Sequence, residues 1–146
     1  MPDVSCSIGP DTQYSVVDTV NSKALRFFVL EDEALVAMFV EDVLCDLGCV
    51  VVGMAASVAS ALQFLEASAG GIDAAILDVN LGRETAYPVA SVLAEARIPF
   101  AFATGYGADG IRQEFAYAPV IAKPFAEEAL SALVNELRRA HDARNA

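Results

Sequence analysis

The sequence predicts an α/β domain with a parallel sheet that helices cover on both faces. Five short apolar runs typical of buried strands alternate with segments in which apolar residues recur at helical spacing. This alternation is the pattern of a parallel sheet with helical connections. The chain has 146 residues, 55% of them hydrophobic, which suits one globular domain with a sizeable core.

Each predicted helix has its own start signal or apolar period. Residues 34–47 place apolar side chains at helical spacing. Ser57 suits the N-cap of a helix over 58–67, and Pro88 suits the first turn of a helix over 88–97. The predicted strands cover 25–30, 49–54, 74–78, 98–103 and 120–122.

The end of the chain is less regular. Residues 81–86 are expected to form a loop. Three glycines within 105–110 leave only a short, weak fourth helix over 111–117. The last helix is predicted over 125–139, with two Glu in its first turn and two Arg at its end, as the helix dipole favours.

The domain is expected to cover residues 24–142, after a flexible leader at 1–23 and before a tail at 143–146. No apolar run approaches the roughly 20 residues of a membrane span, and no signal peptide is visible. The cysteines lack a metal-ligand pattern, which favours a reduced, cytoplasmic setting.

The charge is strongly acidic, with 20 Asp and Glu against nine Lys and Arg and a net charge of −11. Binding to a nucleic-acid backbone needs clustered Lys and Arg, so that class of partner is excluded. An acidic protein suits a cation or a basic partner surface instead.

Five polar residues stand at the carboxyl ends of the predicted strands: Glu31, Asp32, Asp78, Thr104 and Lys123. These ends share one edge of a parallel sheet, where ligands bind. Carboxylates crowded there repel unless a cation lies among them, and hard oxygen ligands favour Mg²⁺. With a lysine and a hydroxyl nearby, the set suits phosphoryl transfer onto an Asp carboxylate. Taken alone, Asp78 is equally consistent with a strand-terminating carboxylate.

The ordered motifs resemble the receiver domain of two-component response regulators (CheY-like), over about residues 24–140. They are Val29-Leu30-Glu31-Asp32-Glu33, Leu77-Asp78-Val79-Asn80-Leu81, Ala103-Thr104-Gly105 and Ala122-Lys123-Pro124-Phe125. The resemblance implies a flavodoxin-like receiver fold with five parallel strands in the order 2-1-3-4-5.

The resemblance also implies roles. Asp78 would accept a phosphoryl group from a histidine kinase or phosphotransferase, and Thr104 and Lys123 would hold phosphate oxygens. The chain would then be a phosphoacceptor that assists its own phosphorylation and dephosphorylation, not a turnover enzyme. The implied Mg²⁺ ligands are Asp32, Asp78, Glu31 through water, and the backbone carbonyl of Asn80. The Lys123-Pro124 bond would be cis.

A narrower likeness lies in Pro99-Phe100-Ala101-Phe102-Ala103-Thr104-Gly105-Tyr106, which resembles the signature of the "FAT GUY" receivers. Those receivers are mostly stand-alone regulators of alphaproteobacteria, and they are commonly phosphorylated by histidine kinases of the HWE or a related type. Val120 occupies the position of the family's aromatic switch residue. We therefore hypothesise that phosphorylation orders residues 104–116. The sequence leaves two possible roles open for each of two residues. Tyr106 either gates access to the site or simply packs, and Arg83 either contacts a kinase or is solvated.

Three other functions fit the sequence less well. A haloacid-dehalogenase-like phosphatase also has an Asp nucleophile after a parallel strand, but it needs a second Asp where this chain has Asn80, and a cap segment. A receiver-like module that binds partners without phosphorylation is disfavoured because all five site residues are present. A nucleotide-binding fold is disfavoured because no glycine-rich loop follows the first strand.

Overall fold

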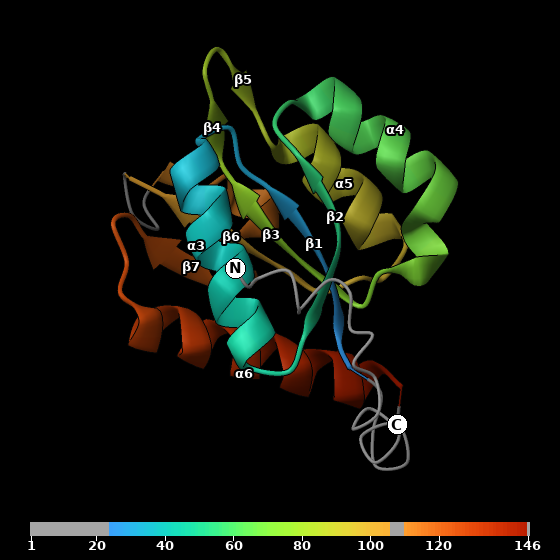
Figure 1. Cartoon of the computed structure of the whole chain (residues 1–146). Coiled ribbons are helices and arrows are strands. Elements are labelled where there is room, and N and C mark those ends of the chain that lie inside the picture. The colour runs from blue at the N-terminus through green and yellow to red at the C-terminus, as the bar shows by residue number, and fades with distance from the viewer. Residues whose placement is uncertain (1–23, 106–109, 146) are drawn as a thin grey trace.

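The computed structural model describes residues 24–105 and 110–145, which form a five-stranded parallel sheet (Figure 1). The strands are β1 (Arg26–Leu30), β2 (Val50–Ala55), β3 (Ala74–Asp78), β6 (Phe100–Thr104) and β7 (Val120–Ala122). Their order in the sheet is β2-β1-β3-β6-β7. The predicted order 2-1-3-4-5 is confirmed, since β6 and β7 are the fourth and fifth strands of this sheet. The predicted leader, residues 1–23, lies outside the described residues.

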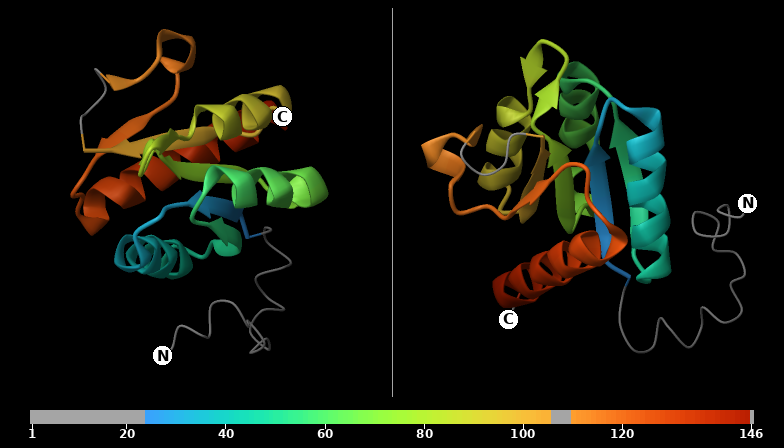
Figure 2. Two further views of the ribbon diagram at one scale, coloured as in Figure 1. Left: turned by 90° about the horizontal axis from the view of Figure 1, so that it is seen from above. Right: turned by 90° about the vertical axis from the view of Figure 1, so that its left-hand side faces the viewer.

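Helices cover both faces of the sheet, as predicted (Figures 1 and 2). They are α3 (Ala34–Asp46), α4 (Val58–Ser68), α5 (Tyr87–Glu95) and α6 (Glu127–Arg144). Successive side chains of a strand point to opposite faces. In β1, Phe27 and Val29 therefore pack with α3 and α6, whereas Phe28 and Leu30 pack with α4 and α5.

Local signals in the sequence explain where two helices begin. The Ser57 hydroxyl oxygen accepts a hydrogen bond from the backbone N–H of Ser60 at 3.2 Å, which confirms the predicted N-cap of α4. Pro88 lies in the first turn of α5, where its missing N–H is not needed. No helix in the described part of the chain is long and apolar enough to span a membrane.

Three short segments have a structure that the sequence did not predict in detail. The predicted loop at 81–86 contains a small antiparallel hairpin of β4 (Asn80–Leu81) and β5 (Glu84–Thr85). Gly82 allows this turn because its φ is +68°, which favours glycine. In place of the weak helix over 111–117 there is one 3₁₀ turn, η3 (Gln113–Phe115). A second 3₁₀ turn, η1 (Ala69–Gly71), follows α4.

The last helix begins at Glu127 and continues to Arg144, so the predicted bounds 125 and 139 are wrong. The reason for the later end is tertiary. The Arg144 guanidinium donates hydrogen bonds to the backbone carbonyls of Ala96 and Arg97, in the turn after α5. The helix therefore includes residues 143 and 144, which the sequence assigned to the tail.

At the amino-terminal ends of β1 and β3, an ion pair joins Arg26 of β1 to Asp73, the residue directly before β3. The Asp73 carboxylate accepts hydrogen bonds from the backbone N–H of Arg26 at 2.8 Å and from its Nε and Nη2 at 3.0 and 2.8 Å. Burial alone would raise the pKa of Asp73, but the hydrogen bonds from Arg26 outweigh burial and hold that pKa below its usual value near 3.8.

Replacing Asp73 with Asn should therefore lower the free energy of unfolding by about 1–2 kcal/mol at pH 7. Because the pKa is lowered in the folded state, the stabilisation is present above pH 4 and is lost as the pH falls through the folded pKa. Urea denaturation at pH 7 and pH 3 measures the difference. Asp46→Asn, at an exposed position of α3, is the control. An equal effect of both variants at pH 7 would contradict the prediction.

Candidate functional site

The carboxyl ends of β1, β3, β6 and β7 bring the predicted residues to one edge of the sheet. Glu31 and Asp32 follow β1, while Asp78 ends β3. Thr104 ends β6 and Lys123 follows β7. In the strand register, Asp78 is the partner of Ala103, and Thr104 is the partner of Ala122. Parallel pairing therefore lines up residues that lie far apart in the sequence.

Lys123 forms the centre of the cluster. Its Nζ donates hydrogen bonds to both carboxylate oxygens of Glu31, at 3.1 and 3.2 Å, and to Oδ2 of Asp78 at 3.3 Å. It also lies 3.6 Å from Oε1 of Glu33. The ammonium group thus faces three carboxylates, two of which are buried. The Lys123-Pro124 peptide bond is cis, as predicted.

Burial and neighbouring charge change the acidity of the cluster. Asp78 is only 4% exposed, and this burial, together with the adjacent Glu31 carboxylate, raises the pKa of Asp78 to about 7 despite the opposing effect of Lys123. Burial alone would lower the pKa of Lys123, but its hydrogen bonds to Glu31 and Asp78 outweigh burial and raise that pKa. Lys123 therefore stays charged at neutral pH, while Asp78 lies close to its titration point.

The donor set fits a hard divalent cation. One oxygen each from Glu31, Asp32 and Asp78 lies within 4.8 Å of the other two. Three carboxylates this close, with one ammonium among them, favour an additional cation. Oxygen-only ligands of this number, two buried and one exposed, suit Mg²⁺, which keeps several waters when bound.

The two remaining predicted residues are positioned by backbone contacts. Thr104 is buried, and its carbonyl oxygen accepts a hydrogen bond from the Lys123 N–H at 2.9 Å. The N–H of Asn80 donates to Oδ1 of Asp78 at 3.3 Å, which holds the turn after β3 against the carboxylate. Whether the Asn80 carbonyl ligates a metal stays a prediction.

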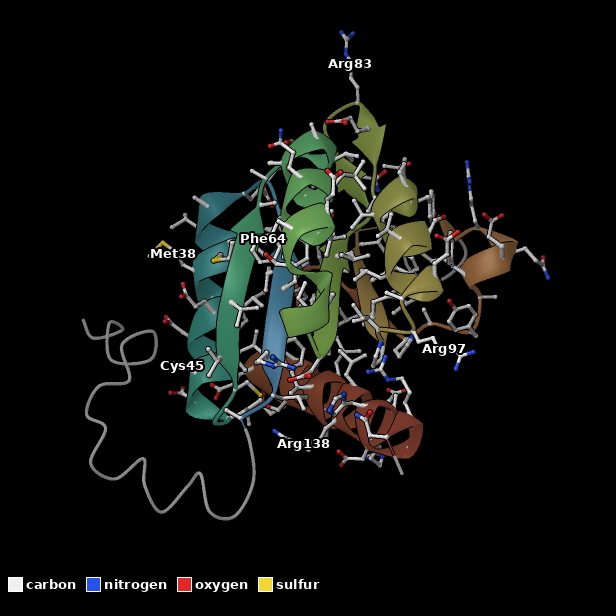
Figure 3. All side chains as sticks on the ribbon, turned by 90° about the vertical axis from the view of Figure 1, so that its right-hand side faces the viewer. Met38, Cys45, Phe64, Arg83, Arg97 and Arg138 are labelled. Atoms are coloured by element: carbon white, nitrogen blue, oxygen red, sulfur yellow. The ribbon has the colours of Figure 1, made fainter. Side chains whose placement is uncertain are left out.

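An open cleft of about 620 Å³ lies over these side chains. Its lining residues are Asp32, Glu33, Val36, Asp78, Asn80, Gly105, Lys123 and Pro124. Glu33 was missed as a site residue, although it was visible as the third carboxylate of the run after β1. Asn80 of β4 lines the cleft. The Arg83 side chain extends from the tip of the β4–β5 hairpin into solvent (Figure 3).

Two predictions about switching depend on the region after β6. Tyr106 lies outside the described residues, and so does part of the segment 104–116 that we expect phosphorylation to order. Val120 is half-buried and packs against the core on the α4–α5 side of the sheet. The position at which the resemblance implies an aromatic switch residue is therefore filled by a small aliphatic side chain.

Comparison with solved structures identifies similar proteins. The solution structure of SdrG from Sphingomonas melonis Fr1 is 43% identical, with a TM-score of 0.70, over 80% of this chain and 98% of SdrG. The BeF3-activated conformation of SdrG from Pseudomonas melonis Fr1 is 44% identical, with a TM-score of 0.66, over 80% and 98% of the two chains. The response regulator PhyR from Brucella abortus is 27% identical, with a TM-score of 0.72, over 84% of this chain and 51% of PhyR.

No protein-family model and no curated protein matched the chain. The solved structures carry the assignment, because SdrG shares more than two fifths of the aligned residues and is covered almost completely. The fold and the strand order agree with it. The chain belongs to the receiver-domain family of response regulators.

Proposed function

We propose that the chain is a stand-alone, cytoplasmic response regulator in which Asp78 accepts a phosphoryl group in an Mg²⁺-dependent reaction. The donor is a histidine kinase, of the HWE or a related type, or a phosphotransferase. The observation that carries the proposal is the contact of Asp78 with Lys123 at 3.3 Å beside two further carboxylates. The phosphorylated chain signals by binding a protein partner; the alternative is a phosphate sink.

In the proposed transfer, one bond to phosphorus forms and one breaks. An oxygen of the ionised Asp78 carboxylate attacks the phosphorus of a phosphohistidine and forms an acyl phosphate. The nitrogen–phosphorus bond breaks, its electron pair returns to the imidazole, and the imidazole takes up a proton from water. Lys123 stabilises the negative charge on the transferred group, and the Thr104 hydroxyl donates to one of its oxygens.

Bound Mg²⁺ would supply charge neutralisation at the oxygens of Asp78 and of the transferred group. The residues proposed to hold it are Asp32, Asp78, the carbonyl of Asn80 and, through water, Glu31. The high pKa of Asp78 gives the cation a second effect. Because a nearby cation favours the charged carboxylate, bound Mg²⁺ would keep Asp78 ionised, and therefore nucleophilic, at neutral pH.

Intact-mass measurement tests the proposal. The protein is incubated with a small acyl phosphate or a phosphorylated histidine kinase, with Mg²⁺ or with EDTA. We expect a single phosphoryl adduct with Mg²⁺ that is lost in EDTA and in Asp78→Asn. Asp46→Asn, whose side chain is exposed on α3, should keep the adduct. Lack of an adduct with both donors, or an adduct that persists in Asp78→Asn, would contradict the proposal.

The same samples separate the rival phosphatase. An enzyme of that class would turn over a generic aryl phosphate repeatedly, whereas a phosphoacceptor would not. Asn80 favours the phosphoacceptor, because its side chain cannot act as the general acid that such a phosphatase needs. Sustained Asp78-dependent release of phosphate from the aryl phosphate would favour the phosphatase.

A further inference from the structure

We propose that Tyr87 is a positioning residue that relays the phosphorylation state of Asp78 to the segment 110–117. The inference rests on the proposed function, because it assigns the output path of the same site. Its basis is a set of contacts by which one buried side chain on α5 holds the chain after β6. Figure 2 shows this segment beside α5, at the margin of the molecule.

The Tyr87 hydroxyl holds two points of that segment. It donates a hydrogen bond to the backbone carbonyl of Gly110 at 3.1 Å. It also accepts a hydrogen bond from the backbone N–H of Arg112 at 3.2 Å. A tyrosine hydroxyl has one proton to donate, so its donor is fully used here. The side chain is buried, which favours direct hydrogen bonds over competing water.

The aromatic ring of Tyr87 also contacts this segment. It stacks on Phe115 of η3 with parallel planes and a centroid distance of 5.7 Å. The Arg112 guanidinium lies over the ring, 4.8 Å from its centroid. Phe102 of β6 meets the ring edge-on at 5.8 Å. The segment is therefore attached to Tyr87 by side chains as well as by backbone groups, and η3 cannot shift without changing them.

Backbone contacts connect Tyr87 to the phosphoacceptor. Val79 follows Asp78 directly, and its carbonyl accepts a hydrogen bond from the Ala86 N–H at 3.0 Å. Ala86 precedes Tyr87 at the start of α5. The N–H of Val79 donates to Ala103 of β6, also at 3.0 Å. Val79 is thus hydrogen-bonded both to Ala86, which directly precedes Tyr87, and to the strand that carries Thr104.

These contacts form a path from the site to the segment 110–117. Thr104 directly follows Ala103, whose carbonyl is bonded to Val79, and Val79 is bonded to Ala86, next to Tyr87. The Tyr87 hydroxyl is bonded in turn to Gly110. A shift of Thr104 toward a phosphoryl group on Asp78 therefore changes the geometry at Tyr87. Coupling of this kind needs a physical element that both sites bias, and the hydrogen-bonded segment is such an element. It offers a route to the surface that does not require an aromatic ring at position 120.

Tyr87→Phe isolates the relay, because it removes the hydroxyl and keeps the stacked ring. Amide hydrogen exchange of Arg112 in the unphosphorylated protein tests the tether alone. We expect the Arg112 amide to exchange about fivefold faster in the variant, because the loss of one hydrogen bond makes local opening more favourable by about that factor. Tyr117→Phe is the control, since its side chain is 68% exposed. Unchanged exchange in Tyr87→Phe would overturn the proposal whether or not Asp78 is phosphorylated.

The relay itself is measured by amide chemical shifts with and without the phosphoryl adduct. In the wild type and in Tyr117→Phe, phosphorylation should shift the amides of Val79, Arg112 and Phe115. In Tyr87→Phe, the adduct and the Val79 shift should remain, while the shifts at Arg112 and Phe115 fall at least about threefold. Equal shifts in all three proteins would mean that Tyr87 is structural only. If no protein forms the adduct, the proposed function fails and the relay with it, although the exchange result still stands.

Discussion

Replacing Lys123 with Met should lower the free energy of unfolding of the metal-free protein by about 2–4 kcal/mol at pH 8. The substitution keeps a long side chain and removes the ammonium group that contacts Glu31 and Asp78. Both carboxylates are buried, so their charges would remain without that partner in a poorly solvated site. Urea denaturation in EDTA measures the loss.

Two conditions should reduce the loss of unfolding free energy in Lys123→Met. Lower pH protonates Asp78, whose pKa is about 7 in the folded protein, and so removes one of the repelling charges. Added Mg²⁺ replaces the missing positive charge, and the variant should gain more stability from Mg²⁺ than the wild type does. Arg139→Met, at an exposed position of α6, is the matched control. Equal destabilisation by the two substitutions would show that the buried carboxylates do not depend on Lys123.

Replacing Asp78 with Asn should have the opposite sign and stabilise the metal-free protein by about 1–3 kcal/mol at pH 8. Burial and the Glu31 charge raise the pKa of Asp78 from 3.8 to about 7 on folding. A carboxyl group with a raised folded pKa binds protons on folding, so stability falls as the pH rises from about 4 to about 7. An uncharged Asn carries no such penalty, and the gain should vanish near pH 4.

Denaturation of both proteins from pH 4 to pH 8 in EDTA measures this difference. A carboxyl ¹³C titration of metal-free wild-type protein should give an apparent pKa for Asp78 near 7. Mg²⁺ should lower that pKa and should stabilise the wild type more than Asp78→Asn. A stability difference that does not change with pH would contradict the assigned cause.

The two substitutions should also be non-additive, because Lys123 and Asp78 contact one another. In the absence of Asp78, the lysine faces one buried carboxylate fewer, so its removal should cost less than in the wild type. A double-mutant cycle in EDTA gives the coupling. Additive effects within about 0.3 kcal/mol would mean that the two side chains act independently.

Much of the fold was encoded in local sequence patterns. The continuous apolar run before Asp78 predicted β3 with its observed bounds, and the helical spacing after Glu33 predicted α3. These patterns are reliable because burial on two faces or on one stripe sets the period of apolar residues directly. The polar residues at the strand ends predicted the site for a related reason, since parallel strands end on the same edge.

The errors lie where distant contacts decide the local structure. The extension of α6 to Arg144 depends on carbonyl groups of the turn after α5, and the hairpin after Asp78 is only two residues long on each side. Neither feature has an apolar period of its own. The position of Glu33 beside Lys123 likewise depends on how the chain turns after β1.

The sequence by itself determined which chemical groups stand at the carboxyl edge of the sheet. Only the tertiary structure decided how they interact, because Lys123 and Glu31 are 92 positions apart and the pKa of Asp78 depends on burial that no local pattern measures. The contact of Tyr87 with Gly110 belongs to the same class, since it joins groups 23 positions apart. A sequence pattern specifies periodicity along the chain, whereas distance, burial and charge coupling arise when packing brings separate segments together.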